Sequence, residues 1–346
     1  MTSRTILIPG TGGNKLLKDG VSLGHPVVLN ARLFLLKAAG MSVEQTVLDM
    51  SMEHRPGQAA PVKTTLSPDS EVTPGPPLDV AYGKLLDRIE GRSSFPYDWR
   101  ADLEYNAGLL IDYLEQERPD AGRWKLVTHS QGGLLALVAS GLYADRKGTA
   151  SAFSELVSHL CMVAPPVYGT VDAANALVVG SELGDEVRGE FRRIAGTWPA
   201  LYQMLPDWRC IKLPQGGDSN LGLFSYQTWQ PYPWVLPFLV QRGYEIRRKY
   251  LEYPTQNLQG VQYSYLFARN QKTADRVIAS PGAAIDFPAG QAAGDGLVPL
   301  DITRARMTSA EKNRTEVIGP DEHTPPHSML LTDDAVVTLV LKRLEQ

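Results

Sequence analysis

The feature that most constrains this chain is a short strand that passes through a tight turn directly into a helix. Residues 124–128 are predicted to form a short strand, and residues 130–143 carry apolar side chains at helical spacing. Further strand patterns lie at 5–8, 157–164, 262–268 and 315–318, and further helical patterns at 102–117 and 333–344. Strands that alternate with helices predict a mostly parallel sheet with helices on both faces.

The turn itself places a serine where a nucleophile is expected. It reads Thr128-His129-Ser130-Gln131-Gly132-Gly133. A strand–serine–helix turn exposes the serine hydroxyl, and the two glycines relieve crowding on one side, although Thr128 replaces the usual glycine on the other. Backbone N–H groups at the helix start can bind an oxyanion beside Ser130. The same residues also fit a helix that is merely capped by Ser130, with a glycine packing site.

A serine nucleophile requires a histidine base, and in this arrangement the base comes last along the chain, after the acid. Of the six histidines, only His323 and His327 follow late enough. Pro325 and Pro326 exclude a helix between them, so we expect no metal site there. His327 leads into the closing helix and is the predicted base, with His323 as the alternative. His129, next to the serine, is assigned a packing role.

The acid is predicted on a loop after a late strand. Asp295 lies between Gly294 and Gly296, which allow the backbone to bend so that the carboxylate can reach an imidazole. The same residues also fit a plain Asp-Gly turn. Three other carboxylates compete for the role, namely Asp286, Asp301 and Asp321.

A glycine-rich turn at residues 9–15 follows the first predicted strand. It lacks the glycine before Lys15 and the hydroxyl residue after it that a phosphate loop needs. The turn can instead offer an N–H group to an oxyanion, and we predict Thr11 for this role with Gln131 as its partner. We expect no metal and no cofactor.

Composition restricts the class of partner and compartment. The 346 residues are 43% hydrophobic and 21% charged with a net charge of −4, which is ordinary for a globular chain and gives no basis for nucleic-acid binding. The two cysteines form no disulfide framework. No signal peptide or run of about 20 apolar residues is found, so the expected compartment is the cytoplasm. Composition does not predict an oligomeric state.

Aromatic residues gather between about 170 and 255, where four of the six tryptophans lie. This favours an inserted cap, so the predicted division is 1–170 and 256–346 for the core and 171–255 for the cap. Tentative substrate contacts are Trp198, Tyr202, Trp234 and Phe238. Residues 234–240 fit a lid that touches lipid or a membrane surface, or lines an acyl pocket, and equally an ordinary core segment of the cap. The proline-rich residues 55–78 are interpreted as an irregular surface excursion.

Taken together, these segments resemble the lecithin:cholesterol acyltransferase family, including its lysosomal phospholipase branch. The matching segments are residues 8–16, 95–100 (Phe-Pro-Tyr-Asp-Trp-Arg), 128–132, 164–169 and 294–299. The resemblance implies the α/β-hydrolase fold, a Ser130–Asp295–His327 triad, oxyanion donors at Thr11 and Gln131, and a cap over a lipid-like acyl site. Unlike the lipoprotein-acting members, the chain shows no lid disulfide.

The expected activity is that of a serine-dependent acyl-ester hydrolase acting on a lipid or another bulky hydrophobic ester. An acyltransferase that passes the acyl group to an alcohol shares the same triad. An esterase or lactonase of a soluble, polyketide-like ester is a further alternative. A catalytically silent lipid-binding module is the alternative outside enzymes.

Overall fold

The computed structural model describes residues 4–23, 52, 72–118, 122–180, 191–318 and 324–346. Its central element is a five-stranded sheet in which every neighbouring pair of strands is parallel. In spatial order the strands are β1 (Thr5–Ile8), β5 (Trp124–His129), β6 (Val157–Val163), β8 (Gln262–Ala268) and β12 (Thr315–Ile318). All five predicted strands are confirmed, with bounds that shift by one residue at most.

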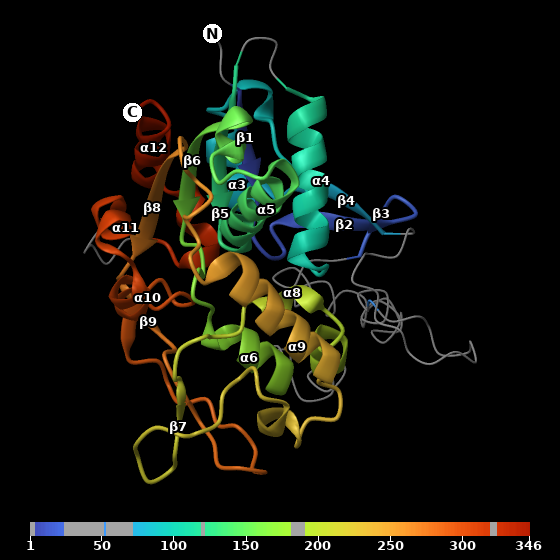
Figure 1. Ribbon diagram of the computed structural model, residues 1–346, viewed down its shortest axis with the longest axis vertical. Coiled ribbons are helices and arrows are strands. Elements are labelled where there is room, and N and C mark those ends of the chain that lie inside the picture. The colour runs from blue at the N-terminus through green and yellow to red at the C-terminus, as the bar shows by residue number, and fades with distance from the viewer. Residues whose placement is uncertain (1–3, 24–51, 53–71, 119–121, 181–190, 319–323) are drawn as a thin grey trace.

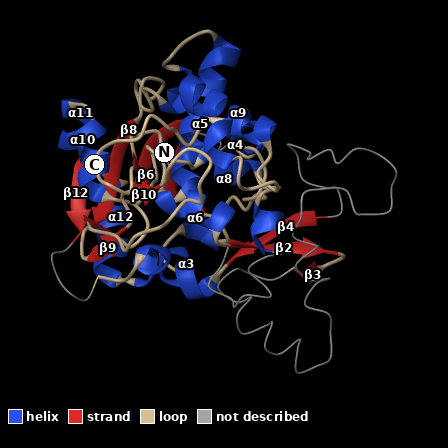
Figure 2. Cartoon of the chain, turned by 90° about the horizontal axis from the view of Figure 1, so that it is seen from below, coloured by secondary structure: helices blue, strands red, loops and turns tan. Residues whose placement is uncertain are grey.

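Alternate side chains of each strand enter two different hydrophobic clusters, because successive side chains point to opposite faces of a sheet. Leu126 packs against the helices α4 (Leu103–Gln116) and α5 (Gln131–Lys147), whereas Val127 packs against α3 (Asp79–Leu86) and α12 (Asp334–Arg343). Figure 2 shows the sheet between α3 on one side and α4 and α5 on the other. Both faces of the sheet are therefore covered, as predicted.

The ends of the core helices follow from local capping. The Asp102 side chain accepts hydrogen bonds from the N–H groups of Glu104 and Tyr105 and so caps α4, as the Asp333 side chain caps α12. Helix α5 ends at Gly148 in a left-handed conformation, which glycine adopts readily. The three helices predicted from apolar spacing are thus confirmed, although α5 runs four residues beyond the predicted end at residue 143.

Three further helices lie at one end of the sheet, below it in Figure 1, in the segment predicted to be a cap. They are α6 (Val171–Val178), α8 (Pro199–Gln203) and α9 (Pro237–Ile246), followed by a π-helical turn (Arg247–Leu251). Their apolar side chains belong to the same buried cluster as those of α4 and α5. The packing is therefore continuous from the core into this segment. The division into core and cap stays a prediction.

The remaining described elements are short. Two helices, α10 (Leu300–Arg306) and α11 (Ser309–Asn313), precede β12. The strand pairs are β7 (Ile211–Lys212) with β10 (Val277–Ile278) and β9 (Gln271–Thr273) with β11 (Ala292–Gly294). The 3₁₀ helices are Glu90–Arg92, Ala152–Glu155, Tyr226–Trp229 and His327–Thr332. Among the described residues, no helix has the length and apolar character needed to cross a membrane.

Part of the proline-rich segment is a strand, which corrects the prediction of an irregular excursion. Strand β4 (Val72–Pro77) pairs antiparallel with β2 (Asn14–Lys18), which also pairs with β3 (Val21–Ser22). Prolines are tolerated because β4 is an edge strand, where one side of the backbone needs no hydrogen bonds. Residues 55–71 lie outside the described residues.

Candidate active site

Ser130 lies on the turn between β5 and α5 in a conformation that is rare for a residue with a side chain. Its φ is 53° and its ψ is −125°. The Ser130 N–H donates to the carbonyl oxygen of Val163 at 2.9 Å, and its carbonyl oxygen accepts from Gly133 at 2.9 Å. Strained backbone of this kind persists only where the surrounding structure holds it, and it concentrates at functional sites.

The glycines after Ser130 allow two segments to approach the turn. A Cβ atom at Gly132 would lie 2.6 Å from the Pro9 carbonyl oxygen, and one at Gly133 would lie 2.7 Å from Pro165. At Gly133 the added atom would also come within 3.3 Å of the Thr128 hydroxyl. The absence of a side chain at Gly133 thus leaves room for the threonine that replaces the usual glycine.

The predicted acid and base are joined directly. The His327 Nδ1–H donates to Asp295 Oδ2 at 2.7 Å, and the His327 backbone N–H donates to the Asp295 carbonyl oxygen at 2.9 Å. The other carboxylate oxygen accepts hydrogen bonds from the N–H groups of Leu297 and Val298. Burial alone would raise the pKa of the Asp295 carboxyl, but His327 and these two donors lower it below its ordinary value.

Two of the rival carboxylates do not share this arrangement. Asp286 and Asp301 are exposed and do not line the cavity beside Ser130. Asp321 and His323 lie outside the described residues. The opposite ring nitrogen of His327, Nε2, is buried and has no hydrogen-bond partner among the described residues. It is therefore free to accept a proton.

The two predicted oxyanion donors lie side by side. The Thr11 hydroxyl donates to Gln131 Oε1 at 2.5 Å, while Gln131 Nε2 donates to the carbonyl oxygen of Trp99 at 3.0 Å. Thr11 stands on a turn closed by a hydrogen bond from the Gly13 N–H to the Gly10 carbonyl oxygen. Neither the Thr11 N–H nor the Gln131 N–H donates to another described residue. Thr11 lines the cavity described below, whereas Gln131 is fully buried. Their role as oxyanion donors stays a prediction.

Residues 95–100 form hydrogen bonds to the glycine-rich turn at residues 9–15. The Tyr97 hydroxyl donates to the Pro9 carbonyl oxygen at 2.9 Å, and Trp99 Nε1 donates to that of Asn14 at 3.2 Å. Asp98 and Arg100 form a buried ion pair at 2.6 Å, with each side chain 1% exposed. This buried network fixes the backbone on which the turn rests.

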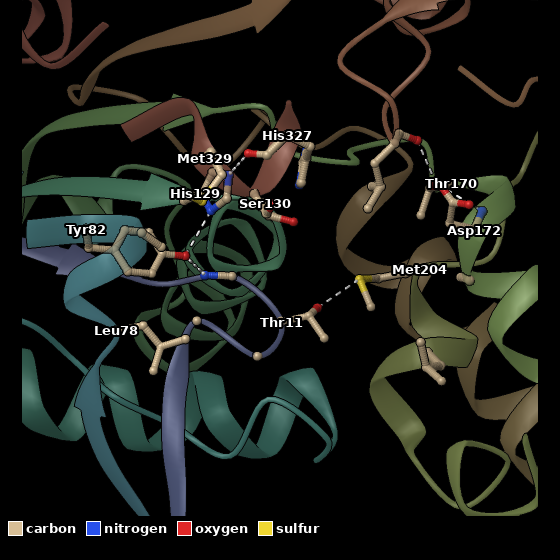
Figure 3. Close-up of a pocket in the computed structure, with 18 of the residues that line it drawn as sticks. Thr11, Leu78, Tyr82, His129, Ser130, Thr170, Asp172, Met204, His327 and Met329 are labelled. Carbon is tan, nitrogen blue, oxygen red and sulfur yellow. Dashed lines mark hydrogen bonds between the residues drawn. The ribbon is translucent and has the colours of Figure 1, made fainter. Parts of the chain in front are cut away.

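A cavity of about 240 Å³ joins these groups (Figure 3). Ser130 and His327 line it together with Thr11, and the opposite wall is formed by the segment predicted to be the cap. The lining from that segment is Asp172, Ala173, Leu201 and Met204, and Thr170 lies directly before it. Apart from a few polar groups, the walls are apolar, as expected of a pocket for a hydrophobic ligand.

The four aromatic residues predicted to contact substrate do not line this cavity. Their contact with substrate stays a prediction. Trp198 and Tyr202 are buried in the core at 3% and 0% exposure, and Trp234 donates through Nε1 to the carbonyl oxygen of Leu177. Phe238 is 47% exposed on α9. Composition cannot distinguish an aromatic side chain that packs a core from one that lines a pocket.

Three titratable residues of the cavity wall escaped the prediction from sequence. Tyr82 comes from α3, which was not predicted, and His129 was assigned only a packing role. Asp172 lies in the first turn of α6, where burial raises the pKa of its carboxyl to about 6. A carboxylate at this position in a helix is common, so the sequence carries no signal for its place in the cavity.

The sheet, its helical layers and the serine on the turn after β5 define the α/β-hydrolase fold. No protein-family model and no curated protein sequence matches the chain. Among solved structures, a chain in the Tle4–Tli4 complex is similar over 99% of this chain and 98% of its own length, with a TM-score of 0.63 at 13% identity. This likeness concerns the fold alone.

Two other solved structures are similar over part of the chain. The mature form of the lipase BlEst2 from Bacillus licheniformis aligns over 72% of this chain and 78% of its own length, at 11% identity with a TM-score of 0.39. Phospholipase PlaB from Legionella pneumophila aligns over 77% of this chain and 38% of its own length, at 17% identity with a TM-score of 0.34.

Proposed function

We propose that this chain is a serine-dependent acyl-ester hydrolase with Ser130 as nucleophile, His327 as base and Asp295 as acid. One observation carries the proposal. His327 donates from Nδ1 to Asp295 at 2.7 Å, while its Nε2 has no partner among the described residues and both His327 and Ser130 line one cavity. A base that is held on one side and free on the other is what a serine nucleophile needs.

The proposed reaction has two stages. Ser130 Oγ attacks the ester carbonyl carbon while His327 Nε2 takes the hydroxyl proton, and Asp295 stabilises the resulting imidazolium. The N–H groups of Thr11 and Gln131 bind the oxyanion, each contributing about 3 kcal/mol by analogy with comparable donors. The protonated His327 then gives its proton to the leaving alcohol. Water, activated by the same base, releases the acid from the acyl-enzyme.

The cavity favours a hydrophobic ester. Its walls are mostly apolar, and its volume of about 240 Å³ lies below the ~300–1,000 Å³ of typical ligand pockets. It therefore suits a short acyl chain, or the part of a longer chain nearest the ester. A lipid is included in this class, and the resemblance of residues 95–100 and 294–299 to the lecithin:cholesterol acyltransferase family supports that choice.

The test is hydrolysis of p-nitrophenyl esters of increasing chain length. Ser130→Ala and His327→Ala are each expected to lower kcat by about 10⁴–10⁶-fold, and Asp295→Asn by about 10⁴-fold. Ser140→Ala is the matched control. Ser140 is buried in α5, the helix that follows Ser130, and its hydroxyl donates only to the Leu137 carbonyl oxygen. Wild-type turnover by Ser130→Ala would contradict the proposal.

A further inference from the structure

A chain of hydrogen bonds runs along the wall of the cavity to the predicted base (Figure 3). It starts at the glycine-rich turn of residues 9–15, called the oxyanion turn below. The Gly10 N–H contacts the Tyr82 hydroxyl at 3.1 Å, and that hydroxyl lies 2.9 Å from His129 Nδ1. On the other side of the ring, His129 Nε2 lies 2.9 Å from the carbonyl oxygen of His327. Tyr82 and His129 are only 2% and 4% exposed, so water does not compete for these bonds.

Chemistry fixes the direction of every bond in this chain. The His327 carbonyl oxygen can only accept, so His129 Nε2 must carry a proton. Burial and the neighbouring His327 lower the pKa of His129 to about 3, which keeps its ring neutral. Its Nδ1 is therefore an acceptor, and the Tyr82 hydroxyl donates to it. The Tyr82 oxygen in turn accepts from the Gly10 N–H.

Close packing places this chain against the nucleophile. A Cβ atom at Gly10 would lie 2.7 Å from Ser130 Cβ and 3.3 Å from His129 Nδ1, so the backbone of the oxyanion turn rests directly on both residues. The rings of His129 and His327 are 5.0 Å apart between centroids. Tyr82 and His129 together thus connect the oxyanion turn, through Gly10, to the end of β5 and to His327.

We propose that Tyr82 and His129 are positioning residues that hold the oxyanion turn and His327 at a fixed separation across Ser130. The inference rests on the proposed hydrolase function and extends it to two residues that touch no reacting atom. A displacement of about 1 Å in such an arrangement lowers the rate about 10²-fold, because transition-state stabilisation depends on the positions of donor and base.

The proposal predicts a specific pattern of kinetics on the p-nitrophenyl ester. Tyr82→Phe and His129→Leu should each lower kcat by about 10- to 100-fold and leave KM nearly unchanged. The double variant should be no worse than the poorer single variant, because both break one chain. His129→Gln should recover most of kcat, since its amide can donate where Nε2 stands.

Tyr143→Phe separates positioning from loss of a buried hydroxyl. Tyr143 is 3% exposed and its hydroxyl bonds Glu115 at 3.0 Å, outside the cavity and the chain described above. Its removal should lower the melting temperature but leave kcat at the wild-type value. If Tyr82→Phe and His129→Leu also keep wild-type kcat while folded, the positioning role is wrong.

Two readouts do not depend on finding a good ester. The rate at which a fluorophosphonate labels Ser130 should fall in Tyr82→Phe and His129→Leu and recover in His129→Gln. NMR of ¹⁵N-histidine-labelled protein, with His129→Gln used to assign the resonance, should find a neutral His129 ring with its proton on Nε2. A proton on Nδ1 overturns the inference. Ser130→Ala that hydrolyses esters like the wild type overturns the hydrolase function instead.

Discussion

Ser130 has a strained backbone that hydrogen bonds and close packing hold in place. A non-glycine residue at a φ of 53° and ψ of −125° adds about 1–3 kcal/mol of strain. Its N–H and carbonyl groups are both hydrogen-bonded, to Val163 and Gly133. The packing of Gly10 against its Cβ atom leaves no room for the turn to relax. The surrounding contacts therefore hold the strained backbone of Ser130 in place.

Asp172 gives a prediction at the same scale. The pKa of its carboxyl is raised from 3.8 to about 6, because burial outweighs the lowering effect of His327 and the nearby Asp295 adds to the rise. In the folded protein the carboxyl thus binds a proton more tightly than in the unfolded chain, and stability falls as the pH rises from about 4 to about 6. Above about pH 6 the full penalty remains, so Asp172→Asn should raise the free energy of unfolding there by about 1–2 kcal/mol.

Urea unfolding of wild type and Asp172→Asn across this pH range checks the prediction. The difference between the two proteins should be largest above about pH 6 and should vanish below about pH 4. Asp112→Asn, which removes an exposed carboxylate on α4, is the control for the loss of one negative charge. A difference that grows as the pH falls would contradict the raised pKa.

At the scale of elements, the turn between β5 and α5 positions Ser130. Substitution of Gly132 tests how closely this turn packs against the end of β1. A methyl group there would meet the carbonyl oxygens of Ile8 and Pro9, both backbone atoms that cannot rotate away. Gly132→Ala should therefore lower the free energy of unfolding by about 1–3 kcal/mol. Gly108→Ala, in the interior of α4, meets only the end of the flexible Arg146 side chain and should gain about 0.5–1 kcal/mol.

Thermal and urea unfolding of both glycine variants, with ester turnover measured alongside, provide the check. If the two substitutions change the free energy of unfolding equally, the close contact of Ile8 and Pro9 with Gly132 does not restrict the residue at position 132. A loss of turnover in Gly132→Ala larger than its loss of folded protein would show displacement of the oxyanion turn.

The strands and long helices were predictable because their signals are local. The short apolar run of β6 and the 3.6-residue spacing of apolar side chains in α4 are both visible in neighbouring residues. Strand β4 was missed because prolines argue against a strand, and its edge position depends on the pairing with β2. Helix α3 was missed because it is short, has Gly83 in its middle and is stabilised by packing against distant segments.

The candidate site was predictable only where chain order and motif restrict the choice. Ser130, Asp295 and His327 follow from the turn, the glycine-flanked loop and the order along the chain. Tyr82 and His129 meet across 47 positions, and no local pattern encodes such a contact. Composition could not place the cap aromatic residues, because it does not report burial: Trp198 and Tyr202 are buried in the core, and Phe238 is exposed on α9.

At the scale of the whole molecule, Asp102 joins the core to the segment predicted as a cap. Its carboxylate caps α4 and also accepts from Gln203 at 2.6 Å and from Arg242 on α9 at 2.8 Å. Because Asp102 is 1% exposed, its removal leaves buried donors unpaired. Asp102→Ala should lower the free energy of unfolding by about 3–5 kcal/mol.

The matched comparison is Asp112→Ala, on the same helix. Asp112 is 53% exposed and lies 3.5 Å from Arg146, so its loss should change stability little. Chemical denaturation of both variants measures the two free energies of unfolding. If Asp102→Ala is as stable as Asp112→Ala, the link between α4 and α9 contributes little to the fold.

The central claim is that Ser130 becomes acylated with His327 as its base, and covalent labelling tests it most directly. Wild type, Ser130→Ala, His327→Ala and Ser140→Ala would be treated with a fluorophosphonate and digested, and the modified peptide identified by mass spectrometry. We predict one adduct, on Ser130, formed at the wild-type rate in Ser140→Ala, far more slowly in His327→Ala and not at all in Ser130→Ala. An adduct on another residue, or equal labelling of wild type and His327→Ala, would contradict the account.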